Sequence, residues 1–342
     1  MIGRIVLLDD IKSRPAAALV VDGQLVDLAI DPEGDAPLPG AIYRAVADRP
    51  MKGQGGLFVK LPEGSGFLRQ TAGIAPGQRL LVQITGPAEA GKAYPVTTRL
   101  LFKSRYAIVT PGAPGLNISR RIKDEAARAE LEALAAAGMA GAPEDLGLIL
   151  RSACLGAEDD EIAEDITAMR DLAQAVLADT EGGPELLVEG AGAHETAWRD
   201  WADPAPDEVI EGGFADNGIA EMIDALLTPR VGLGEGHMMI EPTRALIAVD
   251  VNTGNDTSPA AALKVNIAAA REVPRQLRLR GLGGQVVIDF APMPKKERAI
   301  LDQVIRAAFK SESEVNLAGW TTLGLFEMTR KRDRLPLAAL LA

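Results

Sequence analysis

Short apolar runs separated by turn residues fill the first third of the chain. Residues 1–40 hold strand candidates, with turns predicted at Asp22-Gly23 and at Asp31-Pro32-Glu33-Gly34. Residues 41–110 continue with short apolar runs that recur about every ten residues, with glycines between them. Strands of this length and spacing are typical of a small β-barrel. We therefore predict a barrel within residues 41–110.

The middle of the chain has longer amphipathic patterns. The Pro/Gly-rich stretch "VTPGAPGLN" at residues 109–117 predicts a linker at a domain boundary. An alanine-rich helix is expected next, followed by a buried strand in "EDLGLILRSACLGA" and an amphipathic helix over residues 161–178. The stretch "WRDWADPAPDEVIEGG" predicts a second irregular boundary.

Helix and strand patterns alternate from residue 219 onward, as they do in α/β folds. The periodicity of apolar positions predicts strands at residues 238–252, 285–290 and 321–328. Helices are predicted over residues 260–280 and 295–310, between and after the first two of these strands.

Composition places the chain among globular proteins of several modules. It has 342 residues, of which 47% are hydrophobic and 25% charged, and no apolar run approaches the roughly 20 residues of a membrane span. Acids follow the first apolar stretch at once, which is not typical of a signal peptide. Cys154 is the single cysteine, so an internal disulfide is impossible, and the only histidines are His194 and His237. We expect a cytoplasmic protein.

Charge is unevenly distributed along the chain. The net charge of −12 weighs against a nucleic-acid partner, but basic residues outnumber acids between residues 264 and 306. Acids dominate between residues 158 and 189. Both regions have an alternative interpretation as ordinary solvated faces.

Two predicted strands each end in an acid, Asp250 and Asp289, and Asn252 lies two residues after the first acid. Side chains two apart on a strand share a face, so Asp250 and Asn252 would project together. The segment between the acids is long enough for a helical crossover, which would make the strands parallel and bring both acids to one sheet edge. Two carboxylates and an amide suit Mg²⁺. The alternative is that both acids are turn or cap residues.

The sequence around these acids resembles the catalytic core of the ribonuclease E/G endonucleases. The resemblance lies in "IEPTRALIAVDVNTG", "RQLRLRGLGGQVVIDF" and "GLFEMTRKR". It implies that Asp250, Asn252 and Asp289 are catalytic and that Asp250 and Asp289 hold a magnesium ion. The matching segment, residues 236–342, would be a DNase-I-like catalytic subdomain. RNA-binding arginines are expected at Arg275, Arg278 and Arg280, unless they form only a soluble face.

Weaker resemblance covers the rest of the chain and implies three further parts. An RNase-H-like subdomain would comprise residues 1–40 and 204–235. Residues 41–110 would form an inserted OB-fold RNA-binding module, and residues 117–203 a region that senses an RNA 5′-monophosphate. The expected RNA-binding residues of the module are Phe58, Phe67 and Lys92, and those of the sensor are Arg151 and Ser152.

Each of these assignments has a structural alternative. Phe58 and Phe67 could belong to the barrel core, and Arg151 could be a buried arginine paired with an acid. Family members also carry a Cys-X-X-Cys zinc link after the catalytic core, which this sequence lacks, so we expect no zinc-linked dimer and leave other oligomerisation open. Glu314 stands where a further arginine of the sensor aligns, which weighs against sensing of a 5′-monophosphate.

The resemblance implies a Mg²⁺-dependent endoribonuclease that acts in RNA processing or decay. It would cleave single-stranded RNA by metal-assisted hydrolysis, leaving 5′-phosphate and 3′-hydroxyl ends. Two alternatives stay open: an RNA-binding protein without catalysis, and a metal-dependent phosphohydrolase that acts on small nucleotides.

Overall fold

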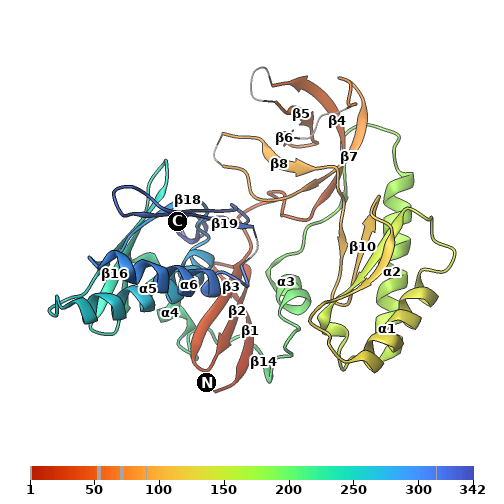
Figure 1. Cartoon of the computed structure of the whole chain (residues 1–342). Coiled ribbons are helices and arrows are strands. Elements are labelled where there is room, and N and C mark those ends of the chain that lie inside the picture. The colour runs from red at the N-terminus through yellow and green to blue at the C-terminus, as the bar shows by residue number, and fades with distance from the viewer. Residues whose placement is uncertain (1, 52–54, 70–72, 90, 313) are drawn as a thin grey trace. The chain divides into compact units, whose positions relative to one another are not determined.

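The computed structural model describes residues 2–51, 55–69, 73–89, 91–312 and 314–342. The chain divides into two compact units. Unit 1 contains residues 23–28 and 212–342, and unit 2 contains residues 2–22 and 29–211. Four sheets with helices between them make a mixed α/β structure, as the sequence predicted at this level (Figure 1). Across the described ranges, no helix has the length and apolar character needed to cross a bilayer.

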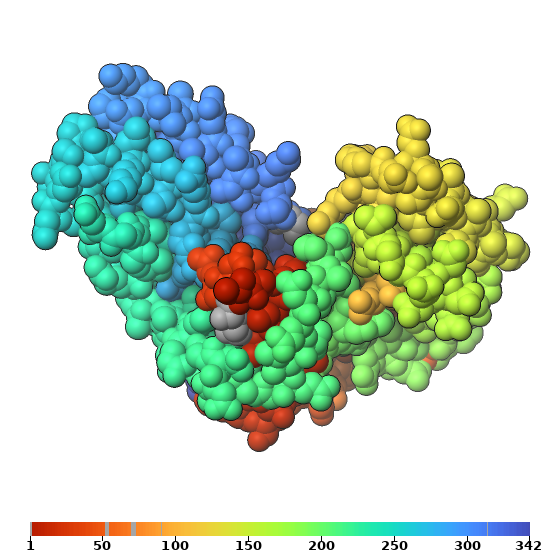
Figure 2. All heavy atoms as spheres, turned by 90° about the horizontal axis from the view of Figure 1, so that it is seen from below, coloured from red at the N-terminus to blue at the C-terminus, as the bar shows by residue number. Residues whose placement is uncertain are grey.

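The N-terminal strands form a sheet of order β14-β1-β2-β3. β1 pairs antiparallel with β2 and parallel with β14, which comes from near residue 210. Asp22 and Gly23 both have positive φ, as a tight hairpin between β2 and β3 requires, so the turn predicted there is confirmed. In Figure 2 these strands, in red, lie against the green segment that holds α3 and β14. The bounds are β1 Arg4–Ile11, β2 Arg14–Val21, β3 Gln24–Ile30, α3 Ala193–Asp200 and β14 Glu208–Glu211.

A small barrel follows, as predicted. Its strands are joined in the order β4-β5-β6-β8-β7, and pairing of β4 with β7 closes it. β13 adds to the outside of β4. Alternate residues of β4, β5 and β7 point inward and form a core that includes Tyr43, Val59 and Val82. The bounds are β4 Ile42–Pro50, β5 Leu57–Lys60, β6 Ser65–Leu68, β7 Arg79–Ile84, β8 Tyr94–Thr97 and β13 Glu185–Val188.

The third sheet has the order β11-β12-β10-β9 and packs against two helices. The predicted buried strand and amphipathic helix are confirmed as β12 and α2. The linker predicted at residues 109–117 is wrong, because β10 and β11 both pair with β12 and only the turn between them is irregular. The bounds are β9 Phe102–Lys103, β10 Ala107–Pro111, β11 Gly115–Ile118, α1 Glu125–Gly138, β12 Leu146–Leu150, η1 Ser152–Cys154 and α2 Asp159–Ala178.

Unit 1 is built on a six-stranded sheet of order β15-β16-β17-β18-β20-β19. β17 and β18 are parallel neighbours joined through α5, and the other pairs are antiparallel. The bounds are α4 Ile219–Leu227, β15 Arg230–Leu233, β16 Gly236–Pro242, β17 Ile247–Asn252, α5 Pro259–Leu279, β18 Gly284–Asp289, η2 Lys295–Glu297, α6 Arg298–Ala308, β19 Val315–Trp320, β20 Phe326–Arg330 and α7 Leu337–Leu340.

Two strand predictions in unit 1 are corrected. Residues 238–252 are not one strand but the hairpin of β16 and β17. Thr243 turns the chain, because its backbone N–H donates to the Leu246 carbonyl (2.9 Å) and its hydroxyl accepts from the Leu246 N–H (3.1 Å). The strand predicted at residues 321–328 is likewise the second half of a hairpin, of which β19 is the first strand.

Candidate functional site

Asp250 and Asp289 lie side by side on the open face of the unit 1 sheet. The opposite face is covered by α5 and α6, against which Val249, Val251 and Ile288 are buried. Because side chains alternate along a strand, the residues between these apolar positions face outward. Asp250 is the register partner of Asp289 in the parallel pair, so their Cα atoms are about 5 Å apart. The structure therefore brings together the two acids that the sequence placed at one sheet edge.

Asn252 completes this group. Its side-chain amide donates to the Oδ2 atom of Asp250 at 2.9 Å, and both residues come from the same face of β17. In this orientation the amide oxygen of Asn252 is not used in the bond to Asp250. The chemistry of the group fits Mg²⁺, which accepts one or two carboxylates and retains several waters. No cluster of three or more His, Cys, Asp or Glu suited to a metal occurs in the part of the chain that the structure describes.

The sequence pattern did not single out β16, whose residues extend the same face. His237 is the register partner of Asn252, and Met239 is the partner of Asp250. Both are half-buried. An imidazole therefore lies one strand away from the amide of Asn252, a juxtaposition that only the β16–β17 hairpin creates.

Arg275 and Arg278 of α5, and Arg280 at its C-cap, each donate to a backbone carbonyl. Arg275 donates to the Leu25 carbonyl (2.6 Å) and to Glu272 (3.0 Å), and Arg278 donates to the Val26 carbonyl (3.0 Å) and to Glu312. They hold β3 residues against the helix.

Arg280 is the most buried of the three, at 7% exposure, and its hydrogen-bond partners among the described residues are neutral groups. It donates to the Gln276 side chain (2.9 Å) and to the Thr228 carbonyl (2.7 Å). Burial lowers the pKa of Arg280, and the charge of Arg275 lowers it further. Arg275 and Arg280 also line a pocket of about 650 Å³. RNA binding by the three arginines stays a prediction, although most of their donors are already engaged.

Phe58 and Phe67 form a partly exposed aromatic pair on the barrel. They are register partners on β5 and β6, and their ring centroids are 5.4 Å apart with the planes tilted. The guanidinium of Arg49 lies 5.5 Å from the centre of the Phe58 ring. Both rings are half-buried and neither belongs to the barrel core. Lys92 is exposed and pairs with Glu89 at 2.7 Å.

Arg151 occupies the end of β12, where its side chain is held by three acceptors. It donates to the Ser104 carbonyl (2.5 Å), to the Arg199 carbonyl (2.9 Å) and to Asp200 (2.9 Å). The alternative of an arginine paired with an acid is therefore observed. Ser152 follows at the start of η1, and its hydroxyl has no hydrogen-bond partner among the described residues.

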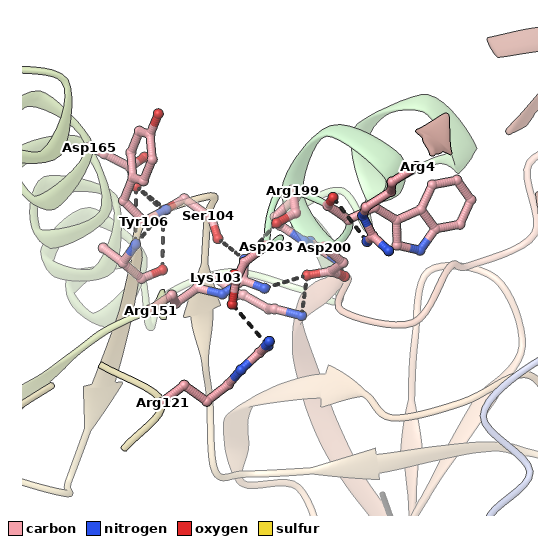
Figure 3. A network of polar contacts seen from close by, with 12 residues as sticks. Arg4, Lys103, Ser104, Tyr106, Arg121, Arg151, Asp165, Arg199, Asp200 and Asp203 are labelled. Carbon is pink, nitrogen blue, oxygen red and sulfur yellow. Dashed lines mark hydrogen bonds and ion pairs between the residues drawn. The ribbon is translucent and has the colours of Figure 1, made fainter. Parts of the chain in front are cut away.

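Asp200 contacts three cations, of which only Arg151 could be singled out from the sequence (Figure 3). Its carboxylate contacts Lys103 (2.6 Å) and Arg199 (3.0 Å) in addition to Arg151. Burial alone would raise the pKa of Asp200, but hydrogen bonds and charges from Arg199 and Lys103 lower it to about 2. Burial lowers the pKa of Lys103, and the two arginines lower it further. We call Lys103, Arg151, Arg199 and Asp200 the cation cluster.

The cation cluster carries net positive charge, because three cations share one carboxylate. A partly buried excess of positive charge is unfavourable until an anion joins it. Phosphate, like carboxylate, is an anion that arginine and lysine donors bind through charge-assisted hydrogen bonds. In the sequence, these residues are marked only by their aromatic neighbours. Two charged residues lie between aromatic residues in "FKSRY" and again in "WRDW".

Comparison with known proteins places these sites in a family context. A sequence model described as "Ribonuclease E/G family" matches residues 102–213 and 211–333. Ribonuclease E of a Nostoc species is 30% identical over 86% of this chain and 51% of its own length, and ribonuclease E of a Synechocystis species is 29% identical with similar coverage. Escherichia coli ribonuclease G is 27% identical over 94% of this chain and 78% of its own. The chain thus spans about half the length of the ribonuclease E relatives.

Proposed function

The chain belongs to the ribonuclease E/G family, and from that premise we propose that it is a magnesium-dependent endoribonuclease. Its substrate would be single-stranded RNA, and hydrolysis would leave 5′-phosphate and 3′-hydroxyl ends. The observation that carries this proposal is the register pairing of Asp250 with Asp289 on adjacent parallel strands. Two carboxylates on one rigid sheet face are a suitable frame for a hard cation.

The residues of this site would have different roles in catalysis. Asp250 and Asp289 would hold one Mg²⁺, and a bound ion supplies a water of lowered pKa together with charge stabilisation at the phosphate. Asn252 fixes the orientation of Asp250 through their 2.9 Å hydrogen bond. Its amide oxygen is the kind of neutral ligand that a cation or a water can use.

RNA would be held mainly by the barrel. The Phe58–Phe67 pair offers partly exposed rings on which bases can stack, and Arg49 adds positive charge beside them. Lys92 would contact a phosphate after breaking its ion pair with Glu89. This pair is exposed, so breaking it costs little free energy. Arg275, Arg278 and Arg280 would act mainly through their electrostatic field, because their donors already bind carbonyls and carboxylates.

The cation cluster would bind the 5′-phosphate of the RNA. Arg151 supplies a guanidinium held in place by three acceptors, and Ser152 supplies a hydroxyl that has no partner among the described residues. Lys103 and Arg199 add charge that one carboxylate does not balance. A terminal phosphate carries up to about two negative charges at neutral pH and would neutralise this excess.

We assign subdomain identities on the same premise. The unit 1 sheet within residues 236–342 would be the DNase-I-like catalytic subdomain, and the barrel within residues 41–110 the OB-fold module. Residues 117–203 would form the 5′-sensor, and residues 1–40 with 204–235 the RNase-H-like subdomain. Ultraviolet crosslinking of bound RNA tests these roles: crosslinks should concentrate in the barrel and the sensor, and their absence from the barrel would contradict its assignment.

A cleavage assay on a short single-stranded RNA with Mg²⁺ tests the activity. The protein should cut it, EDTA should stop the reaction, and a ligase should join the product ends. Asp250→Asn and Asp289→Asn should each lower the rate by orders of magnitude, since loss of the ion removes both the activated water and the charge stabilisation. Asp224→Asn is a matched control, because Asp224 is exposed on α4 and has no partner among the described residues. Near-normal cleavage by either active-site variant would refute the assignment.

A further inference from the structure

Trp198 is an exposed tryptophan at the end of α3. Its side chain is 53% exposed, whereas Trp201, three residues later, is buried at 5%. The guanidinium of Arg105 lies 5.1 Å from the centre of the Trp198 ring and 5.6 Å from that of Tyr106. Arg105 therefore contacts two aromatic rings, and only one of them is accessible to a ligand.

This pair directly adjoins the cation cluster. Arg151 donates to the Ser104 and Arg199 carbonyls, and these residues are the chain neighbours of Arg105 and Trp198. Arg105 and Trp198 are thus each one residue along the chain from a carbonyl that holds Arg151.

Among the described residues, neither Arg105 nor Trp198 has a hydrogen-bond partner for its side chain. No carboxylate partner of Arg105 occurs among the described residues, and its Nε atom is buried without a hydrogen-bond partner. Trp198 makes no hydrogen bond or ring contact other than with Arg105 in the described ranges. An exposed indole held by a cation is the arrangement that favours stacking of a further flat, electron-rich group.

We propose that Trp198 and Arg105 form a stacking site for the base of the 5′-terminal nucleotide of RNA. This rests on the proposed function, in which the cation cluster holds the phosphate of that nucleotide. Stacking accepts any base because every base has a π-face, and it strengthens with the area of the ring system. The site therefore gives RNA with a 5′-terminal purine an advantage over RNA that begins with a pyrimidine.

Equilibrium binding in EDTA, which prevents cleavage, tests the proposal. The probes are 3′-labelled RNAs that carry a 5′-monophosphate and begin with adenosine, uridine or an abasic nucleotide. The wild-type protein should bind the adenosine RNA most tightly and the abasic RNA least tightly. Trp198→Ala should raise the Kd for the adenosine RNA by about fivefold to 150-fold. It should leave the Kd for the abasic RNA unchanged.

Two variants serve as controls. Trp198→Phe should restore most of the affinity because it keeps an aromatic face. Leu116→Ala removes a similarly exposed apolar side chain of β11 in the same unit and should change nothing. Equal binding of adenosine and abasic RNA by the wild-type protein overturns the stacking site without any variant. An equal effect of Trp198→Ala on both RNAs also overturns it, because that pattern means a structural role.

Failure of the phosphate site would look different. It would appear as equal binding of 5′-phosphorylated and 5′-hydroxyl adenosine RNA. The dependence of binding on the 5′-terminal base can be present or absent whatever that comparison shows. Failure of the stacking site and failure of the phosphate site can therefore be told apart.

Discussion

Replacement of Asp200 by asparagine should have opposite effects on stability and on phosphate binding. The carboxylate is the only anion that contacts Lys103, Arg151 and Arg199 in the described part of the cation cluster. Folding lowers its pKa from 3.8 to about 2, which corresponds to at most about 2 kcal/mol of stabilisation at neutral pH. The lowered pKa of Lys103 offsets part of this, because burial disfavours its charged form. We therefore expect Asp200→Asn to lower the unfolding free energy of unit 2 by about 1–2 kcal/mol.

The pH dependence provides a second test of the same charge. A group whose pKa is lower in the folded state stabilises above its unfolded pKa and loses this effect as the pH falls through the folded value. The difference between wild type and Asp200→Asn should thus be complete above about pH 4 and should close toward pH 2. Chemical unfolding followed by tryptophan fluorescence suits this measurement, since Trp201 is buried beside the cluster.

Phosphate binding should change in the other direction. Without the carboxylate, three cations have no competing anion, so RNA with a 5′-monophosphate should bind more tightly to Asp200→Asn. Asp171→Asn is the control. The side chain of Asp171 is 60% exposed, so its ion pair with Arg170 contributes little to stability. Our interpretation is that Asp200 occupies an anion site within the cation cluster. It would be refuted if Asp200→Asn had unchanged stability at neutral pH, or if it bound the phosphate more weakly while its stability stayed normal.

Three further changes test the other sites. Phe67→Ala should weaken single-stranded RNA binding by about 1–3 kcal/mol with little loss of thermal stability, and a loss of stability alone would mean that the ring only supports the barrel. Arg151→Ala should abolish the faster cleavage of 5′-monophosphorylated over 5′-hydroxyl RNA, and a wild-type protein that cuts both equally would remove the sensor. Asn252→Ala should lower cleavage less than Asp250→Asn does, because a neutral ligand binds a hard cation more weakly than a carboxylate does. It should also raise the Mg²⁺ concentration needed for half-maximal rate. A larger loss of cleavage than in Asp250→Asn would contradict this order.

The positions of Asp250 and Asp289 could be predicted because local rules determine them. Alternation along each strand fixes which residues face outward, and a helix between two neighbouring strands makes the strands parallel. The same reasoning failed over residues 238–252, where the chain turns at Thr243 within the stretch "EPTR", although apolar residues flank this stretch on both sides. Its hydrogen bonds join Thr243 to Leu246, only three residues away, so the turn is a local feature that apolar periodicity does not detect.

The cation cluster and the arginines of α5 could not be predicted in this way. Lys103, Arg151 and Asp200 come from three segments separated by about fifty residues each, and only packing of unit 2 brings them together. Arg275 and Arg278 look like a solvated basic face in the helix pattern. Their acceptors are the carbonyls of Leu25 and Val26, 250 and 252 residues earlier in the chain. The periodicity of a helix cannot predict a hydrogen-bond acceptor that lies so far away in the sequence.

The attachment of residues 23–28 to unit 1 has a consequence for the order of folding. All of unit 2 after β3 is inserted between this short segment and the remainder of unit 1. Arg334, which pairs with Asp27, leaves the ribosome 307 residues after it. Until then the carboxylate of Asp27 lacks the Arg334 charge that offsets its burial, so residues 23–28 gain their full stabilisation in unit 1 only after the C-terminal residues have been made. Folding of the inserted unit first would shorten the effective loop that must close, and we expect the strands of the unit 1 sheet to gain hydrogen-exchange protection after those of unit 2.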